Sequence, residues 1–203
     1  MRTVFIVNPK AGKGQGREKF IREIEEASRS TGIPAEVYST QAVGDGEVLA
    51  AQLAEKAEAR EEETRIIACG GDGTLNEVLN GAMHRNYVTI GVVPIGTGND
   101  FCRNFPDAGD FLDLEAQLRG DVMECDAIRY SGMLAGKEQT RYCANMFNIG
   151  FDCNVVDLTA TLKNSPLIAG SMAYMLAVLC ILVKKKGADL KVELDGEVYE
   201  DGP

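Results

Sequence analysis

Three glycine-rich segments, each directly after a short apolar run, constrain the fold more than any other feature of the sequence. Glycine permits tight turns, and short apolar runs bounded by turn residues have the length of buried β-strands. The glycine-rich segments are Asn8–Gly16, Gly70–Thr74 and Pro94–Arg103, and the runs before them are Thr3–Asn8, Arg65–Cys69 and Thr89–Val93. Strands that each lead into such a turn indicate one shared edge of a sheet, where ligands bind in open α/β proteins.

Helix-like stretches separate the apolar runs. A further run, Ala35–Ser39, also has strand character. The predicted helices are Arg17–Ser28, Glu47–Arg60, Leu75–Met83 and Phe111–Arg119. Strands that alternate with helices are typical of a parallel sheet covered on both faces. We therefore predict an α/β fold with a parallel sheet and helices on both of its faces.

The pattern changes after Cys125. Two strands, Asp126–Tyr130 and Arg141–Ile149, are predicted to form a hairpin joined by the polar loop Ser131–Gln139. A helix over Phe151–Lys163, an apolar helix over Leu167–Val183 and a strand over Asp189–Leu194 follow. We predict two domains: an α/β domain over residues 1–125, and the incomplete beginning of a β-rich second domain over residues 126–203.

Leu167–Val183 is the stretch that raises the question of a membrane. Its seventeen residues contain no charged side chain, and Lys184-Lys185-Lys186 follow. A membrane span needs about 20 residues, and Pro166 stands where a helix would begin. We interpret the stretch as a buried helix with cations at its carboxyl end, and a helix that touches a membrane surface is the alternative.

The charges argue against one class of partner and favour another. The chain has 21 Lys and Arg against 31 Asp and Glu, and this net charge of −10 argues against a nucleic-acid partner. Residues 1–22 nevertheless hold six cations and one acid, a local charge of +5. This island favours a phosphate-binding turn after the first strand, although a solvated turn is also open. The six cysteines form no C-x-x-C pair, so we expect reduced thiols and a cytoplasmic protein.

The second glycine segment, Gly70-Gly71-Asp72-Gly73-Thr74, places one carboxylate inside a tight strand-to-helix turn. Backbone N–H groups of such a turn, with the N-terminus of the next helix, can hold phosphate oxygens. A carboxylate there would repel phosphates unless Mg²⁺ or a hydroxyl group lies between them. We expect Thr74 to cap the helix and to reach a phosphate with its hydroxyl; a capped turn without a ligand is the alternative.

Together the three segments resemble the catalytic domain of the diacylglycerol kinase family, in its soluble bacterial branch. The resemblance rests on the second segment followed by Leu75-Asn76-Glu77, on Asn8-Pro9-x-x-Gly12 and on Pro94-x-Gly96-Thr97-x-Asn99-Asp100-Phe101. The second segment is shared with NAD kinases and distantly with 6-phosphofructokinases, whereas the third is a lipid-kinase pattern. The resemblance implies a Rossmann-like fold of the NAD kinase and phosphofructokinase type. It also implies ATP-dependent phosphorylation of a lipid hydroxyl such as that of diacylglycerol.

The same resemblance implies the residues of the site. Asp72 would orient Mg²⁺-ATP as the carboxylate associated with the metal, and Asp72, Asp100 and Asp126 would form the catalytic acidic network. ATP would be bound by Asn8, Pro9, Lys10, Ala11, Gly12, Thr40, Gly71, Asp72, Gly73, Thr74, Leu75, Asn76, Glu77 and Thr97. The lipid substrate would be met at a membrane surface, so peripheral membrane association is expected. The sequence leaves the oligomeric state open, a homodimer included.

Two other functions stay open at this point. The chain could phosphorylate a ribose hydroxyl, as an NAD kinase does, or it could be a nucleotide-binding fragment without catalytic activity. In the family, the second domain continues well past the counterpart of Pro203, through the general base and a structural Mg²⁺ site. We therefore expect the 203 residues alone to be inactive, and we interpret Asp195-Gly196-Glu197 as a hairpin turn rather than the site of that base.

Overall fold

The structure is a computed structural model that describes residues 1–11, 17–134, 136–148, 150–163, 170–184 and 190–201. The chain forms two compact units, Met1–Met146 and Phe147–Pro203. The first unit contains the strands that precede the glycine-rich segments, and the second contains the apolar helix.

A four-stranded parallel sheet is the centre of the first unit. Its strands are β1 (Arg2–Val7), β2 (Ala35–Ser39), β3 (Thr64–Gly70) and β4 (Val88–Pro94), in the order β2-β1-β3-β4. Phe5 of β1 lies opposite Val37 of β2 and Ile67 of β3, and every neighbouring pair of strands is parallel. The predicted parallel α/β sheet is confirmed, and each predicted strand agrees with the observed one to within one residue at either end.

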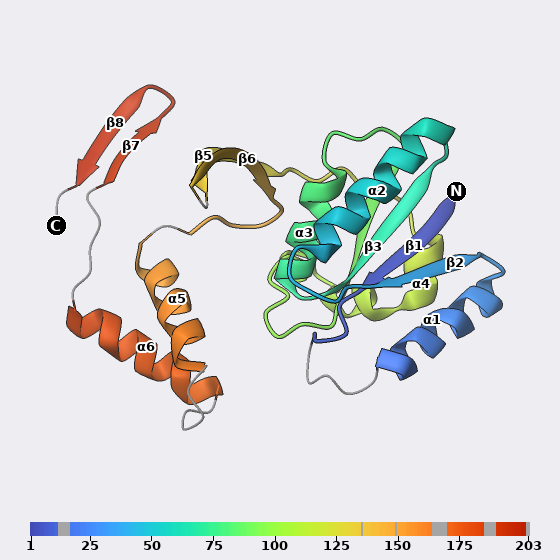
Figure 1. Ribbon diagram of the computed structural model, residues 1–203, viewed down its shortest axis with the longest axis horizontal. Helices are drawn as coiled ribbons and strands as arrows, with labels where there is room; N and C mark the ends of the chain where they lie inside the picture. The colour runs from blue at the N-terminus through green and yellow to red at the C-terminus, as the bar shows by residue number, and fades with distance from the viewer. Residues whose placement is uncertain (12–16, 135, 149, 164–169, 185–189, 202–203) are drawn as a thin grey trace. The chain divides into compact units, whose positions relative to one another are not determined.

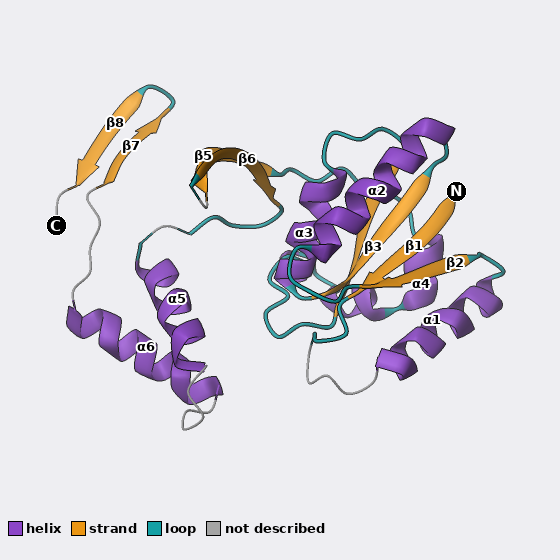
Figure 2. Ribbon diagram, viewed as in Figure 1, coloured by secondary structure: helices purple, strands orange, loops and turns teal. Residues whose placement is uncertain are grey.

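Four helices cover the two faces of this sheet. They are α1 (Arg17–Thr31), α2 (Asp45–Arg60), α3 (Asp72–Ala82) and α4 (Leu114–Arg119). Helices α2 and α3 lie on one face, and α1 and α4 lie on the other (Figures 1 and 2). This arrangement confirms the predicted layers of helix, sheet and helix.

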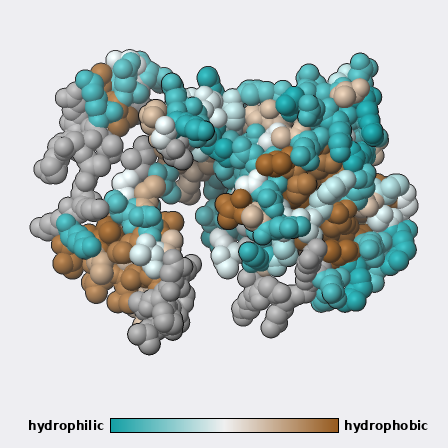
Figure 3. All heavy atoms as spheres, viewed as in Figure 1, coloured by the Kyte–Doolittle hydropathy of each residue, from teal (hydrophilic) through white to brown (hydrophobic). Residues whose placement is uncertain are grey.

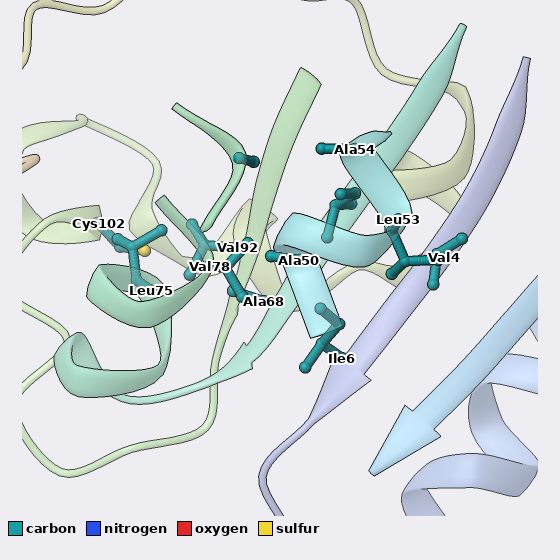
Figure 4. Close-up of a cluster of buried hydrophobic side chains, with 12 residues drawn as sticks. Val4, Ile6, Ala50, Leu53, Ala54, Ala68, Leu75, Val78, Val92 and Cys102 are labelled. Atoms are coloured by element: carbon teal, nitrogen blue, oxygen red, sulfur yellow. The ribbon is translucent and has the colours of Figure 1, made fainter. Parts of the chain in front are cut away.

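Successive side chains of β1 enter two separate cores, because neighbouring residues of a strand point to opposite faces. Val4 and Ile6 pack against α2 and α3, in the cluster shown in Figure 4. Phe5 and Val7 pack on the other face, against α1 and α4. All four side chains are at most 1% exposed, and burial of each stabilises the fold by roughly 1.5–3 kcal/mol. A sheet buried on both faces is a rigid base for the loops at its carboxyl edge.

The segment before α4 differs from the prediction of one helix over Phe111–Arg119. A 3-10 helix spans Ala108–Leu112, and α4 begins only at Leu114. Asp113 separates the two, because its side chain accepts hydrogen bonds from the N–H groups of Glu115 (2.9 Å) and Ala116 (3.1 Å). An aspartate that caps a helix in this way has extended backbone angles, so the helix cannot continue through it.

The hairpin after the sheet was predicted in the right region but with the wrong strands. Strand β5 spans Ile128–Leu134 and β6 spans Lys137–Cys143, so most of the predicted loop Ser131–Gln139 is strand. The turn between them includes Gly136, whose φ of 77° is readily adopted by glycine. The chain bends after Cys143, and Ile149 lies outside the described residues.

Strand β6 is held against α2 and α3 by polar contacts. The Asn80 side chain donates to the carbonyl of Tyr142 and accepts from its N–H, both at 2.9 Å, and Asn76 donates to the same carbonyl at 3.1 Å. Arg141 donates two hydrogen bonds to the carboxylate of Glu47, at 3.0 and 2.7 Å. The hairpin is therefore part of the first compact unit, and the domain boundary predicted between residues 125 and 126 stays a prediction.

The second unit is a pair of helices followed by a hairpin. It comprises α5 (Phe151–Lys163), α6 (Gly170–Lys184), β7 (Leu190–Leu194) and β8 (Glu197–Asp201). Asp195 and Gly196 form the hairpin turn with φ angles of 51° and 88°, and the carboxylate of Glu197 accepts a hydrogen bond from the Tyr199 hydroxyl at 2.7 Å. The interpretation of this motif as a hairpin turn is confirmed.

Helix α6 is buried along only part of its surface. Ala177 and Ile181 pack with Val155 of α5, and Ala173 is also buried, whereas Met175 is 73% exposed. Hydrophobic residues gather over α5 and α6 in Figure 3. The predicted helix is confirmed from Gly170 to Val183, whereas residues 167–169 lie outside the described residues. Its predicted burial holds for one face alone. Within the part of the chain that the structure describes, no helix is long and apolar enough to cross a membrane.

Candidate functional site

The carboxyl ends of the four strands are joined by three backbone hydrogen bonds. The N–H of Thr40 donates to Val7 at 3.0 Å, that of Asn8 to Cys69 at 2.9 Å, and that of Gly96 to Gly70 at 3.1 Å. These bonds continue the sheet pairing by one step, so each loop begins at a fixed position beside its neighbour. The predicted convergence of the glycine-rich segments at one edge of the sheet is confirmed for their described residues.

The second loop leads directly into α3. Gly71 occupies the N-cap position, and Asp72 is the first residue of the helix. The first N–H groups of a helix have no partner within it, and its dipole places partial positive charge at this end. The turn of Gly71, Asp72 and Gly73 is thus a backbone site suited to an anion.

Thr74 does not cap the helix, in contrast to the prediction. It lies inside the first turn, and its hydroxyl oxygen accepts a hydrogen bond from the Asn8 side chain at 3.2 Å. Thr74 is 5% exposed, and a Cβ atom at Gly70 would come within 2.2 Å of its hydroxyl oxygen. Thr74 therefore links the second loop to the first, and Gly70 makes room for it.

Asp72 connects the second loop to the third. Its Oδ2 atom accepts a hydrogen bond from the N–H of Asn99 at 2.8 Å, and its Oδ1 atom accepts one from the N–H of Asp100 at 2.7 Å. Each carboxylate oxygen can accept a second bond. Asp72 is exposed, so both oxygens can still reach water or a cation.

The second and third loops approach each other backbone to backbone. A Cβ atom at Gly96 would lie 2.3 Å from the Cα of Gly71, so a side chain cannot be accommodated there. A Cβ at Gly98 would lie 2.6 Å from Oδ2 of Asp72 and 3.8 Å from Oδ2 of Asp100. The two predicted catalytic carboxylates Asp72 and Asp100 therefore lie beside the same glycine.

Gly73, unlike Gly96 and Gly98, has free space where a side chain would lie. A Cβ atom there would meet no atom within 4 Å, although Gly73 belongs to the tightest glycine cluster of the sequence. Its φ lies outside the left-handed range, so neither packing nor backbone strain explains a glycine at this position. The open space beside it is at the N-terminus of α3.

The third loop is organised by Asn99, a residue of the sequence motif for which the resemblance implies no role. Its side chain accepts from the N–H of Gly96 at 3.1 Å and donates to the carbonyls of Gly96 at 2.9 Å and Pro94 at 3.1 Å. Its φ of 58° is one that asparagine tolerates better than most residues. The Gly-x-x-Asn spacing was the available signal for such a self-closing turn.

Several predicted nucleotide-binding residues lie around this edge. Asn8 accepts from the N–H of Lys10 at 3.0 Å, in a turn that also contains Pro9 and Ala11. Thr40 is 7% exposed at the end of β2. Thr97 is exposed in the third loop, and Gly12 lies outside the described residues.

Three residues after Thr74 were also predicted to bind the nucleotide, and the structure places their side chains against protein. Leu75 is 7% exposed within the hydrophobic core. Asn76 donates to Tyr142 of the hairpin, and Glu77 accepts hydrogen bonds from backbone N–H groups at the start of α2. Their assignment to the nucleotide stays a prediction.

The three predicted catalytic carboxylates are only partly brought together. Asp100 forms an exposed ion pair with Arg103 at 3.2 Å, and such pairs contribute little to stability. Asp126 is exposed between α4 and β5, and it makes no hydrogen bond or ion pair with another described residue. Its role stays a prediction. The described residues contain no cluster of three metal-binding side chains.

Two buried side chains of the first unit, Cys102 and Arg65, have structural roles. Burial raises the pKa of the Cys102 thiol to about 11, and the charge of Asp72 adds to this effect, so the thiol is not a ready nucleophile. Arg65 donates to the carbonyls of Gln117, Leu118 and Gly120 at the end of α4, at 2.6 to 3.1 Å. Its pKa is lowered by burial.

Comparison with known proteins identifies relatives of this arrangement. The family described as diacylglycerol kinase catalytic domain matches residues 2–130. Diacylglycerol kinases of Staphylococcus aureus, from strains MRSA252 and Newman, are each 33% identical over 204 residues, which cover 98% of this chain and 59% of the relative.

Solved structures show the same relationship. A putative diacylglycerol kinase from Bacillus anthracis str. Sterne superposes with a TM-score of 0.62 at 25% identity, covering 98% of this chain and 62% of the other. A second structure from that organism, at 22% identity and a TM-score of 0.59, shares the fold. The chain thus spans about three fifths of the length of these relatives. By the family match and these identities, the protein belongs to the diacylglycerol kinase catalytic domain family.

Proposed function

We propose that this chain forms the nucleotide-binding part of an ATP-dependent lipid kinase, which transfers the γ-phosphate of ATP to a lipid hydroxyl such as that of diacylglycerol. One observation carries the proposal: the open N-terminus of α3 lies where three loops converge, with Asp72 and Asp100 beside it. The names of the relatives supply the acceptor class, and the residues of this chain supply the phosphate site.

The backbone at this N-terminus suits phosphate groups. The orphan N–H groups of the first turn can donate to phosphate oxygens, and the helix dipole favours negative charge there. Gly73 presents no side chain to the open space, so a phosphate could approach the backbone closely. Asn8 and Thr74 connect the first loop to this turn at 3.2 Å, so the two loops would bind one nucleotide together.

The carboxylates suit Mg²⁺ that arrives with ATP better than a resident metal. Mg²⁺ commonly binds one or two carboxylates together with phosphates and water. Asp72 and Asp100 provide such carboxylates beside Gly98. No group of three metal-binding side chains is found among the described residues. The ion would neutralise phosphate charge, and phosphoryl transfer depends mainly on that neutralisation and on positioning.

The remaining assignments are part of the proposal. Asp126 would join the acidic network, and the enzyme would act in the cytoplasm at a membrane surface, as a monomer or a homodimer. We interpret Glu197 as a hairpin residue rather than the general base, and its carboxylate accepts a hydrogen bond from Tyr199.

The test is a phosphotransfer assay with a protein of the relatives' length that contains this chain. Radiolabelled ATP is offered with diacylglycerol in mixed micelles and, side by side, with NAD. We expect label in the lipid, and we expect Asp72→Ala to lower turnover by at least roughly a hundredfold. Asp107→Ala is the matched control, because Asp107 is exposed and its side chain makes no capping bond.

Two outcomes would overturn the proposal. Wild-type turnover by Asp72→Ala would remove Asp72 from the site. Label in NAD instead of the lipid would replace the lipid kinase with a ribose kinase.

A further inference from the structure

Glu77 is predicted by resemblance to bind the nucleotide, but its carboxylate already has two backbone partners. Oε1 accepts from the N–H of Gly44 at 2.9 Å, and Oε2 accepts from the N–H of Gly46 at 3.0 Å. Gly44 is the N-cap of α2 and has no side chain to cap the helix. Glu77 therefore supplies from α3 the capping carboxylate that α2 lacks.

The backbone around Glu77 fits this contact closely. A Cβ atom at Gly46 would lie 2.7 Å from Oε2 and 3.1 Å from Cβ of Glu77, and Gly46 is buried. Gly44 has a φ of 91°, which strains any other residue. The two glycines thus allow the carboxylate to approach both N–H groups at once.

The loop from β2 to α2 is held by a second carboxylate as well. Asp45 accepts from the N–H groups of Gln41 at 2.7 Å and Ala42 at 2.9 Å, and these bonds lower its pKa. Asp45 closes the loop on itself, whereas Glu77 fixes the closed loop to α3. Thr40, the predicted nucleotide-binding residue, is the last residue before this closed segment.

Helix α3 places the two contacts at a fixed separation. Asp72 and Glu77 are five residues apart on the helix, which corresponds to about 7.5 Å along its axis. Any shift of the β2–α2 loop relative to the turn at Asp72 must therefore break the bonds of Glu77.

We infer that Glu77 is a positioning residue: it fixes Thr40 and its loop relative to the phosphate-binding turn, and it does not contact the nucleotide itself. This inference rests on the proposed function. It predicts that Glu77 acts on nucleotide affinity through Thr40, so that the effects of changing the two residues are not additive.

The experiment is a double-mutant cycle on the full chain. Glu77→Gln, Thr40→Ala and the double variant are titrated with Mg²⁺-ATP by calorimetry. Glutamine keeps the size of the side chain, but its amide NH₂ would face one of the two backbone donors. We expect Glu77→Gln to weaken affinity about tenfold, and to change it less than about twofold when Thr40 is already alanine.

Hydrogen exchange measures the contact independently of the nucleotide. In the free protein, Glu77→Gln should accelerate exchange of the Gly44 and Gly46 amides while exchange in β3 stays slow. Glu58→Gln is the matched control, because Glu58, like Glu77, is a helical glutamate that accepts a backbone hydrogen bond. It accepts from the N–H of Asn86 at 3.1 Å and from Arg85 at 2.8 Å, near the end of α2 that lies away from the loops. It should leave both the affinity and these two amides unchanged.

The outcomes separate the inference from the proposed function. Additive effects of Glu77→Gln and Thr40→Ala would overturn the inference in favour of a direct contact, and unchanged affinity in Glu77→Gln would overturn it too. A wild-type chain that does not bind Mg²⁺-ATP would overturn the proposed function and the inference with it; the exchange of Gly44 and Gly46 would then still show whether the cap exists.

Discussion

The first turn of α3 and the turn after it come from one sequence signature, but their surroundings are opposite. In the first turn Asp72 and Gly73 are exposed, and Gly73 has open space beside it. Farther along the helix, in the part that we call the framework turn, Asn76, Glu77 and Asn80 are half-buried, and their side chains form hydrogen bonds with the hairpin and with the β2–α2 loop. One short helix thus contains both an open turn, Asp72 and Gly73, whose polar groups face open space, and a framework turn whose side chains are hydrogen-bonded to neighbouring elements.

The difference indicates how a binding edge is kept both open and rigid. Buried polar groups are nearly always hydrogen-bonded, and such bonds fix their neighbours. A ligand binds to groups whose hydrogen-bonding capacity is not yet used, and neighbouring residues must hold these groups in place. The framework turn provides the rigidity, so the open turn can leave its N–H groups and carboxylate available.

The largest effect is expected at Gly96, which packs from the third loop against Gly71, directly before the open turn. In Gly96→Ala, the new methyl would lie 2.3 Å from the Cα of Gly71, and backbone cannot yield as a side chain can. We expect a loss of about 3 kcal/mol of stability, measured by native-state hydrogen exchange of the β3 amides. Gly109→Ala is the control, because its Cβ meets open space; equal stability of both variants would refute the close packing.

The framework turn is tested by Asn80→Ala. The variant loses two hydrogen bonds to Tyr142, while Asn76 keeps its own bond to the same carbonyl. We expect a loss of about 1 kcal/mol of stability, with faster exchange in β6 and no change in Mg²⁺-ATP affinity. Weakened ATP binding with an undisturbed hairpin would instead indicate that Asn80 acts at the nucleotide site rather than in the framework turn.

We expect the smallest effect at Asp45, where a substitution changes the stability of the β2–α2 loop in a way that depends on pH. Hydrogen bonds from Gln41 and Ala42 lower its pKa from the ordinary value of 3.8. A lowered carboxylate pKa stabilises the fold above the ordinary value, and this stabilisation disappears as the pH falls through the lowered one. Asp45→Asn should therefore reduce protection of the β2–α2 loop at pH 7, and the difference from wild type should vanish in acid. A difference that grows in acid would contradict this assignment.

Much of the first unit could be predicted from the sequence, because hydrophobic periodicity determines strands and helices that bury both faces of a sheet. The hairpin was predicted in the right region, but the bounds of its strands could not be, since Lys137–Cys143 is mostly polar and such a run is typical of a loop. Its position depends on Asn80 and Tyr142, which are 62 residues apart in the sequence.

The site shows a similar division. Glycines after three strands were enough to predict where the loops meet, because the carboxyl ends of parallel strands share an edge. The partners of Glu77 lie 31 and 33 residues away, and no local pattern indicates them. Thr74 was predicted as a cap because its type favours that position, but the helix begins two residues earlier, and the Thr74 hydroxyl accepts a hydrogen bond from Asn8 instead.

The most direct test of the account is the affinity of Gly73→Ala for Mg²⁺-ATP, measured by calorimetry beside the wild type and Gly109→Ala. A Cβ at Gly73 meets no atom within 4 Å, so alanine should preserve stability or raise it by up to about 1 kcal/mol. The methyl group would occupy the space that we assign to phosphate. We predict affinity weakened by about tenfold or more without a lower melting temperature; wild-type affinity in Gly73→Ala would contradict the account.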